Sequence, residues 1–292
     1  KINILDTPGH QDFQEDTFRT LTAVDSVIIV IDAAKGVEPQ TEKLMNVCRM
    51  RKTPVIVFIN KMDRPSNDTF DLLDDIEKQL LIKVRPLSWP INNGPDFKGV
   101  YNIFDQSLSL FNPNITEIEE VIQFKDVNDP ELDRYIGKDA DTLREELEMV
   151  EGVYPEFDIN SYLAGNLAPV FFGSALYNFG VQELLNSFVK IAPSPRPKMS
   201  EERLVNPDEE SFTGFVFKIH ANIDPNHRSR IAFVKICSGR FERSLDGKGE
   251  VLLRGPYPEN RGVVHLESVI GPLPQVGLRL GDPCDAVLQN LI

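Results

Sequence analysis

The stretch PVIVFINKMD, residues 54–63, is an unbroken apolar run that leads directly into the tetrapeptide Asn-Lys-Met-Asp. An apolar run without polar alternation is typical of a strand that is buried on both faces of a parallel sheet. In open α/β sheets ligands bind outside the carboxyl ends of the strands, which is where residues 60–63 would lie. The stretch therefore predicts an α/β fold with a binding loop after this strand.

Similar short runs alternate with helical patterns between residue 2 and about residue 192, so we expect a mostly parallel sheet covered by helices. The other strands are expected at INIL (2–5), SVIIVI (26–31), PLSWPI (86–91) and APVFF (168–172). Apolar residues at helical spacing predict helices through Leu21, through Val47, through Ile76 and over residues 181–191.

The alternation stops between residues 92 and 167, where short strands near Val100 and Ile115 and an acidic helix over about 141–151 indicate a surface insertion. The segment 193–210 is rich in proline and charge, which is typical of a linker. Beyond it, FTGFVFKIHANI (212–223) and RIAFVKICSG (230–239) alternate like antiparallel strands around the turn DPNHR, and they predict a small β-barrel or sandwich. We therefore expect domains at 1–192 and 211–292.

The composition disfavours several classes of protein. With 45 acidic and 31 basic residues, the net charge of −14 disfavours general attraction to nucleic-acid phosphates. No apolar run approaches the roughly 20 residues of a membrane span. Three widely spaced cysteines without a CxxC pair argue against a disulfide framework or a zinc site. We expect a cytoplasmic location, no membrane partner and no general nucleic-acid affinity.

A second motif, D-T-P-G at residues 6–9, closes the first expected strand. A carboxylate at Asp6 can hold a magnesium ion directly or through water, and Gly9 lets its backbone N–H approach a terminal phosphate closely. The pattern D-x-x-G also occurs at residues 96–99 and 246–249. The motif is therefore informative only through its place at a strand end.

The tetrapeptide at 60–63 matches the chemistry of guanine. A carboxylate at Asp63 can accept hydrogen bonds from guanine N1–H and from the 2-amino group, and adenine has neither donor at these positions. Asn60 can bond guanine N7 or the neighbouring backbone, and the stem of Lys61 can cover the base. The loop GSAL at 173–176 follows another expected strand. Its N–H groups would face the base oxygen, with an ordinary strand-to-helix turn as the alternative.

These motifs, in this order, resemble those of the translational GTPases, whose fold is a P-loop NTPase-type G domain followed by a β-barrel domain. Within that family, EDTFRTLTAVDS, IDAAKGVE, FINKMDR and FKIHANIDPNHRSRIAFVKICSGRFE are most similar to the bacterial peptide chain release factor 3 type. The resemblance covers residues 1–243. It implies a GTPase that uses GTP, GDP and Mg²⁺, acts on the ribosome and recycles class I release factors.

Carried over by position, the resemblance implies a magnesium role, through water, for Asp6, a γ-phosphate contact for Gly9 and a catalytic role for His10. His10 would orient the attacking water, because phosphoryl transfer depends on positioning more than on a strong base. The implied GTP-binding residues are Asp6, Thr7, Pro8, Gly9, His10, Asn60, Lys61, Met62, Asp63, Ser174, Ala175 and Leu176.

Two features depart from the family pattern. No G-x-x-x-x-G-K-[ST] loop occurs, so the nest for the α- and β-phosphates and the strand before it are missing. We expect these parts to lie upstream of Lys1, and we expect this chain by itself not to hydrolyse GTP. After Arg243 the sequence no longer resembles the family's barrel, and we expect residues 244–292 not to contain the family's C-terminal domain.

Two other functions stay open. An elongation factor G-like or ribosomal protection GTPase carries the same motifs, although NIDPNHRSR (222–230) argues against it. A non-catalytic binding module with a degenerate G domain would also lack the phosphate loop.

Overall fold

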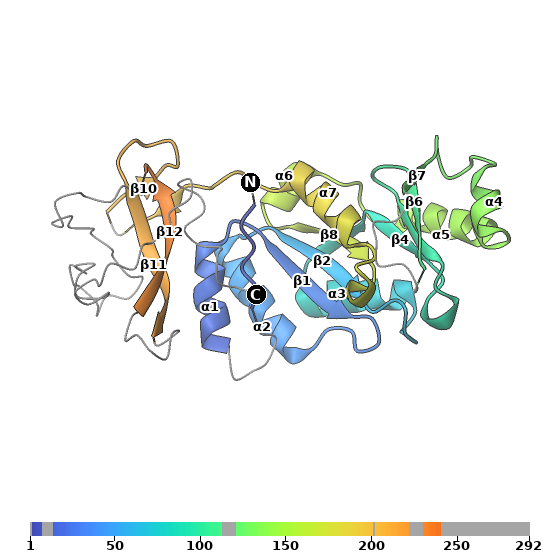
Figure 1. Cartoon of the computed structure of the whole chain (residues 1–292), viewed down its shortest axis with the longest axis horizontal. Coiled ribbons are helices and arrows are strands. Elements are labelled where there is room, and N and C mark those ends of the chain that lie inside the picture. The colour runs from blue at the N-terminus through green and yellow to red at the C-terminus, as the bar shows by residue number, and fades with distance from the viewer. Residues whose placement is uncertain (1, 8–13, 113–120, 201, 222–229, 241–292) are drawn as a thin grey trace. The chain divides into compact units, whose positions relative to one another are not determined.

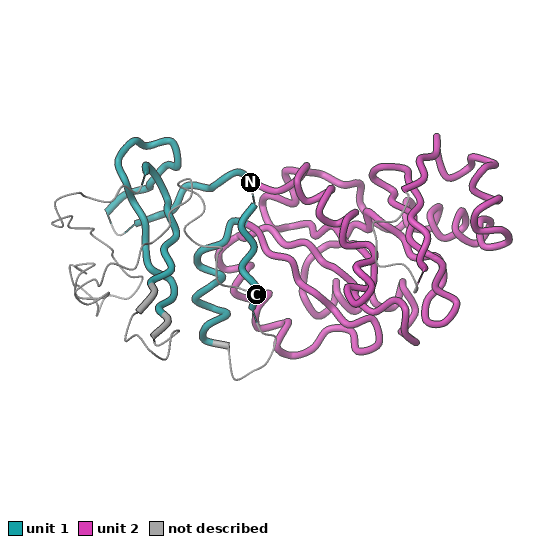
Figure 2. The backbone as a smooth tube through the Cα atoms, viewed as in Figure 1, with its two compact units in different colours: residues 1–25, 194–292 teal, residues 26–193 magenta. Residues whose placement is uncertain are grey.

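A computed structural model of the chain describes residues 2–7, 14–112, 121–200, 202–221 and 230–240. The chain divides into two compact units, one of residues 26–193 and one of residues 1–25 together with 194–292 (Figure 2). Among the helices within these described ranges, none has the length and apolar content that a membrane span requires.

The larger unit contains a parallel sheet of four strands in the order β1-β2-β8-β3. Figure 1 shows β1, β2 and β8 side by side. These strands are β1 (Val27–Asp32), β2 (Val55–Asn60), β8 (Leu167–Phe172) and β3 (Lys83–Pro86). All six residues of β8 and the first five of β2 are buried, as expected for strands that are covered on both faces. The α/β fold class predicted from the sequence is confirmed.

Three helices of this unit follow the predicted spacing of apolar residues: α2 (Pro39–Arg51), α3 (Thr69–Leu80) and α7 (Val181–Ile191). The short helix α6 (Ile159–Leu163) lies within the segment predicted as an insertion and was not itself predicted. Helix α3 begins where the carboxylate of Asp68 accepts hydrogen bonds from the N–H groups of Phe70 and Asp71. It ends at Leu81, which adopts a left-handed conformation with φ of 50°.

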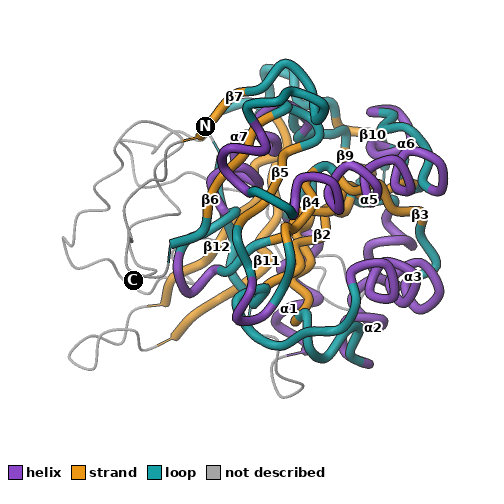
Figure 3. The backbone as a smooth tube through the Cα atoms, turned by 90° about the vertical axis from the view of Figure 1, so that its right-hand side faces the viewer, coloured by secondary structure: helices purple, strands orange, loops and turns teal. Residues whose placement is uncertain are grey.

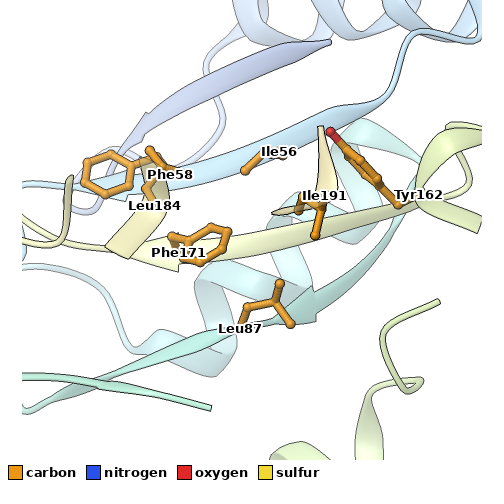
Figure 4. Packing of buried hydrophobic residues seen from close by; sticks show 7 residues of the cluster. All are labelled: Ile56, Phe58, Leu87, Tyr162, Phe171, Leu184 and Ile191. Carbon is orange, nitrogen blue, oxygen red and sulfur yellow. The ribbon is translucent and has the colours of Figure 1, made fainter. Parts of the chain in front are cut away.

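One hydrophobic cluster joins the sheet to helix α7 (Figure 4). Strand β2 contributes Ile56 and Phe58 at alternate positions, because successive residues of a strand point to opposite faces, and β8 contributes Phe171. The cluster consists of Ile56, Phe58, Leu87, Tyr162, Phe171, Leu184 and Ile191. Its burial holds β2 and β8 side by side, so the loops that follow these strands start from a rigid base.

Two expected strands are corrected by the structure. Residues 2–5 form no strand, and the side chain of Ile4 is 61% exposed. No described strand of its unit pairs with this segment, and a strand requires a partner for its backbone N–H and C=O groups. The segment 86–91 is divided between two sheets, because the Leu87 N–H donates to Val170 O in β8 while Leu87 O accepts from the Ile103 N–H.

After Leu87 the chain enters an antiparallel sheet in the order β4-β5-β6-β7 (Figure 3). Its strands are β4 (Ser88–Ile91), β5 (Gly99–Asn102), β6 (Ser107–Leu110) and β7 (Val121–Gln123). Helices α4 (Leu132–Ile136) and α5 (Asp139–Val153) follow. The predicted strand near Val100 and the predicted acidic helix are confirmed, whereas Ile115 lies outside the described residues.

The smaller unit contains α1 (Gln14–Ala23) and an antiparallel hairpin of β11 (Thr213–Ala221) and β12 (Arg230–Ser238). The hairpin confirms the two alternating segments predicted there, although the turn DPNHR and the chain after residue 240 lie outside the described residues. The segment expected to be a linker contains a short strand pair, β9 (Lys198–Met199) with β10 (Leu204–Val205).

Candidate functional site

Three strand-end loops of the larger unit are joined by backbone hydrogen bonds at the carboxyl end of the parallel sheet. The Ala33 N–H after β1 donates to Asn60 O at 2.9 Å, and the Asn67 N–H donates to Ala33 O at 3.1 Å. The Met62 N–H after β2 donates to Gly173 O after β8 at 3.1 Å. The loops after β1, β2 and β8 therefore form one connected rim, although they lie far apart in the sequence.

The Asn60 side chain joins two of these loops. Its Oδ1 accepts hydrogen bonds from the Lys61 N–H and the Ala175 N–H, both at 2.8 Å. Of the two roles considered for Asn60, a bond to the neighbouring backbone is the one that the structure contains. The Ala175 N–H, which we expected to face a base oxygen, is occupied by this bond because the amide oxygen of Asn60 reaches it directly.

Two side chains at this rim carry buried polar atoms without a partner. The Asp63 side chain is 11% exposed, and its Oδ1 is buried with no hydrogen-bond partner among the described residues. Its other oxygen, Oδ2, lies 3.8 Å from Arg64 Nε. Ser174 is fully buried, and its Oγ also has no partner there. A buried polar atom without a partner costs about 1–3 kcal/mol, so each of these atoms has hydrogen-bonding capacity that the described residues do not use.

The remaining residues of the two motifs have different surroundings. Met62 is fully buried and anchors its loop in the core. Leu176 lies in the short η3 helix (Ala175–Tyr177), and its side chain is 70% exposed. The structure thus brings residues 60–63 and 174–176 together at one end of the sheet, where the buried Met62 anchors its loop.

Lys61 and Asp32 form an ion pair between neighbouring strand ends. Lys61 Nζ lies 2.5 Å from Asp32 Oδ2, and the backbone of Lys61 adopts a left-handed conformation with φ of 70°. Burial opposes ionisation of Asp32, but the hydrogen bonds from Lys61 Nζ and the Ala34 N–H, with the charges of Lys61 and Lys35, outweigh it and lower the pKa of Asp32. The carboxylate is therefore ionised at neutral pH.

Asp32 was absent from the residues predicted for the site. The available signal was its place as the last residue of an apolar run, SVIIVID, whose strand pairs with the strand that precedes Asn60. In the register of β1 and β2, Asp32 lies opposite Asn60. The sequence does not specify that register.

The antiparallel sheet contacts both loops of the site. The Gly94 N–H, in the short η2 helix (Gly94–Asp96), donates to Met62 O at 2.8 Å. The ring centroids of Phe97 and Phe179 lie 5.5 Å apart, and those of Phe111 and Tyr177 lie 5.3 Å apart. The segment predicted as an insertion thus supports the rim from one side.

The first motif is only partly described. Asp6 and Thr7 lie in the smaller unit without helix or strand, whereas Pro8, Gly9 and His10 lie outside the described residues. The expectation that this motif faces residues 60–63 therefore stays a prediction. Over the part of the chain that the structure describes, no group of three or more His, Cys, Asp or Glu side chains is arranged to hold a metal ion.

The chain matches the models of two protein families. Residues 1–194 match the model of the elongation factor Tu GTP binding domain. The chain belongs to this family of translational GTPases. Residues 211–246, in the smaller unit of this translational GTPase, match the model of elongation factor G domain 2. Both matches agree with the G domain and β domain that the sequence predicted.

Among solved structures, a crystal structure of a protein from Thermus thermophilus has a similar fold. It aligns with a TM-score of 0.58 and 22% sequence identity. The alignment covers 81% of this chain and 35% of that protein, so this chain spans about a third of the length of that relative.

Proposed function

We propose that this chain is the GTP-binding part of a translational GTPase and that residues 60–63 and 174–176 form its guanine-binding site. The observation that carries the proposal is the unpaired, buried Oδ1 of Asp63 beside the two loops that Asn60 ties together. Ser174 Oγ, also buried and unpaired, belongs to the same rim. These atoms fit a ligand that brings hydrogen-bond donors and an acceptor to the end of the sheet.

Guanine provides those groups. The Asp63 carboxylate accepts hydrogen bonds from N1–H and the 2-amino group, and a base without these donors leaves the buried oxygen unpaired. Asn60 acts indirectly, because its Oδ1 organises the backbone of both loops. The methylene stem of Lys61 covers one face of the base, while its charged end is held at Asp32.

At the phosphate end of the nucleotide, Asp6, Gly9 and His10 have the roles that the family resemblance implies. Gly9 contacts the γ-phosphate and His10 orients the attacking water. GTP hydrolysis is then promoted because the water is held in position relative to the γ-phosphate. A magnesium ion, held near Asp6 through water, would neutralise phosphate charge when bound. Hydrolysis is proposed for the whole protein, with residues 1–192 as the G domain, 193–210 as the linker and 211–292 as the β domain.

We further propose that the whole protein acts on the ribosome in the cytoplasm. The segments most similar to the release factor 3 type favour a role in termination, in which GTP hydrolysis accompanies the recycling of class I release factors. The match of residues 211–246 to elongation factor G domain 2 favours an elongation factor G-like role instead. Stimulated dissociation of class I release factors from terminated ribosomes would support the first role, and stimulated translocation would support the second.

The guanine site is tested by the base selectivity of Asp63→Asn in the full chain. An asparagine at this position replaces an acceptor oxygen by an NH₂ donor, which mismatches the 2-amino group of guanine and matches the 2-carbonyl of xanthine. Because a mismatched buried group costs about 1–3 kcal/mol, we expect GDP affinity to fall by about 10- to 100-fold and affinity for xanthosine diphosphate to rise.

The matched control is Asp71→Asn, on the exposed surface of α3, which should leave both affinities unchanged. Calorimetric titration with GDP, xanthosine diphosphate and ADP measures the effect. If Asp63→Asn binds GDP as tightly as the unmodified chain and gains no affinity for the xanthine nucleotide, Asp63 does not read the base.

A further inference from the structure

We propose that Asp32 is a positioning residue of the guanine site, and that its carboxylate holds the Lys61 side chain in the conformation that covers the base. The inference rests on the proposed function, because it assigns a role at the same site. It adds Asp32, at the end of β1, which is absent from the site residues that the sequence predicts.

The geometry of the pair is specific. Asp32 ends β1 and lies opposite Asn60 of β2, so the next residue, Lys61, starts one strand away from the carboxylate. Lys61 Nζ reaches Asp32 Oδ2 at 2.5 Å. The Asp32 side chain is 16% exposed and that of Lys61 is 44% exposed, so the pair lies partly shielded from water at the rim.

The carboxylate itself is held by its own loop. Its second oxygen, Oδ1, accepts a hydrogen bond from the Ala34 N–H at 2.9 Å. The backbone O of Asp32 accepts hydrogen bonds from the Lys35 and Gly36 N–H groups at 3.1 and 2.9 Å. The same turn is fixed from outside, because the Val37 N–H donates to Asp75 Oδ2 in α3 at 3.2 Å. Asp32 is therefore a rigid attachment point, and the flexible partner in the pair is Lys61.

This difference in rigidity has a consequence for binding. A lysine side chain has four rotatable bonds, and a ligand that packs against its stem must restrict them unless another contact already does so. Asp32 makes that contact before the nucleotide arrives. Its removal is expected to weaken GDP binding about 2- to 10-fold, because the freed lysine must be ordered on binding.

The test is a double-mutant cycle with Asp32→Ala and Lys61→Ala in the full chain, read out by GDP affinity. If Asp32 acts through Lys61, Asp32→Ala has its effect only when Lys61 is present, and the two losses are not additive. If Asp32 only stabilises the fold, the loss persists in the Lys61→Ala background. Glu38→Ala, which removes the exposed partner of Lys35 on the same loop, is the matched control and should leave GDP affinity unchanged.

A second readout needs no nucleotide. Acylation of lysine amines, followed by mass spectrometry, should modify Lys61 more slowly than the exposed Lys43 in the unmodified chain. Asp32→Asn should raise the rate at Lys61 and leave the rate at Lys43 unchanged. Equal rates at Lys61 and Lys43 in the unmodified chain, or additive losses in the cycle, would overturn the role of Asp32. If the unmodified chain binds no GDP, both the proposed function and the role of Asp32 fail. If Asp63 selects the base but the losses from Asp32→Ala and Lys61→Ala are additive, only the role of Asp32 fails.

Discussion

Replacement of Asn60 by alanine tests whether one amide oxygen holds the two loops of the site together. The change removes the acceptor of two hydrogen bonds, from the Lys61 N–H and the Ala175 N–H, both 2.8 Å long. The backbone and the buried part of β2 stay in place, since only the last residue of the strand is altered. The effect should therefore be confined to the rim.

The magnitude follows from the surroundings of the two bonds. The Lys61 N–H is partly buried and loses its partner, which costs about 1 kcal/mol, while the Ala175 N–H is exposed and regains a bond to water, at a cost of about 0.5 kcal/mol. In the variant, the left-handed backbone of Lys61 is no longer supported by the hydrogen bond from its N–H to Asn60 Oδ1, which adds to the cost. We expect the free energy of unfolding to fall by about 1–2 kcal/mol, or the Tm by about 2–8 °C.

The single tryptophan provides the assay. Trp89 is 1% exposed, donates a hydrogen bond to Glu146 at 2.7 Å and packs against Phe70 and Phe172, so its emission reports on unfolding of the larger unit. Urea titrations followed by this emission give the free energy of unfolding.

Asn46→Ala is the matched control, because the Asn46 side chain accepts only an exposed hydrogen bond from Arg49 and its loss should change stability by less than about 0.5 kcal/mol. Equal stability of the Asn60 and Asn46 variants would refute the idea that the Asn60 amide joins the loops.

Gly36 has φ of 69°, and an added Cβ would lie 2.9 Å from Asp75 Oδ2, so Gly36→Ala should lower the free energy of unfolding by about 1–2 kcal/mol. Gly152→Ala, where a Cβ meets nothing within 4 Å in helix α5, should instead raise it by about 0.5–1 kcal/mol; equal effects in the same urea titrations would contradict the strain at Gly36. Burial raises the pKa of the Cys48 thiol from 9.0 to about 11, so a thiol reagent at pH 8 should modify Cys48 only after unfolding, and rapid modification with native Trp89 emission would contradict its burial. Because the unfolded thiol ionises first, stability should fall as the pH rises above 9.

Much of the fold could be predicted locally. The helix expected over residues 181–191 has those same bounds in the structure, because its apolar residues recur at helical spacing and one face meets the core. Strands β2 and β8 could be predicted because a continuous apolar run indicates a strand that is buried on both faces. Segment 86–91 is apolar enough to predict one strand of the parallel sheet, but only Pro86 belongs to β3, whereas Ser88–Ile91 form β4 of the antiparallel sheet. The hydrogen bonds on the two sides of Leu87 decide this division, and they depend on distant partners.

The sequence by itself determined which chemistry stands at the ends of the strands, because the motifs at residues 60–63 and 173–176 follow directly after the apolar runs that bury their strands. Only the tertiary structure decided how those motifs meet. The order β1-β2-β8 puts Ala175 within reach of Asn60 and Asp32 within reach of Lys61. The physical reason is that strand order and register are properties of pairing between distant segments, and no local pattern of residues encodes them.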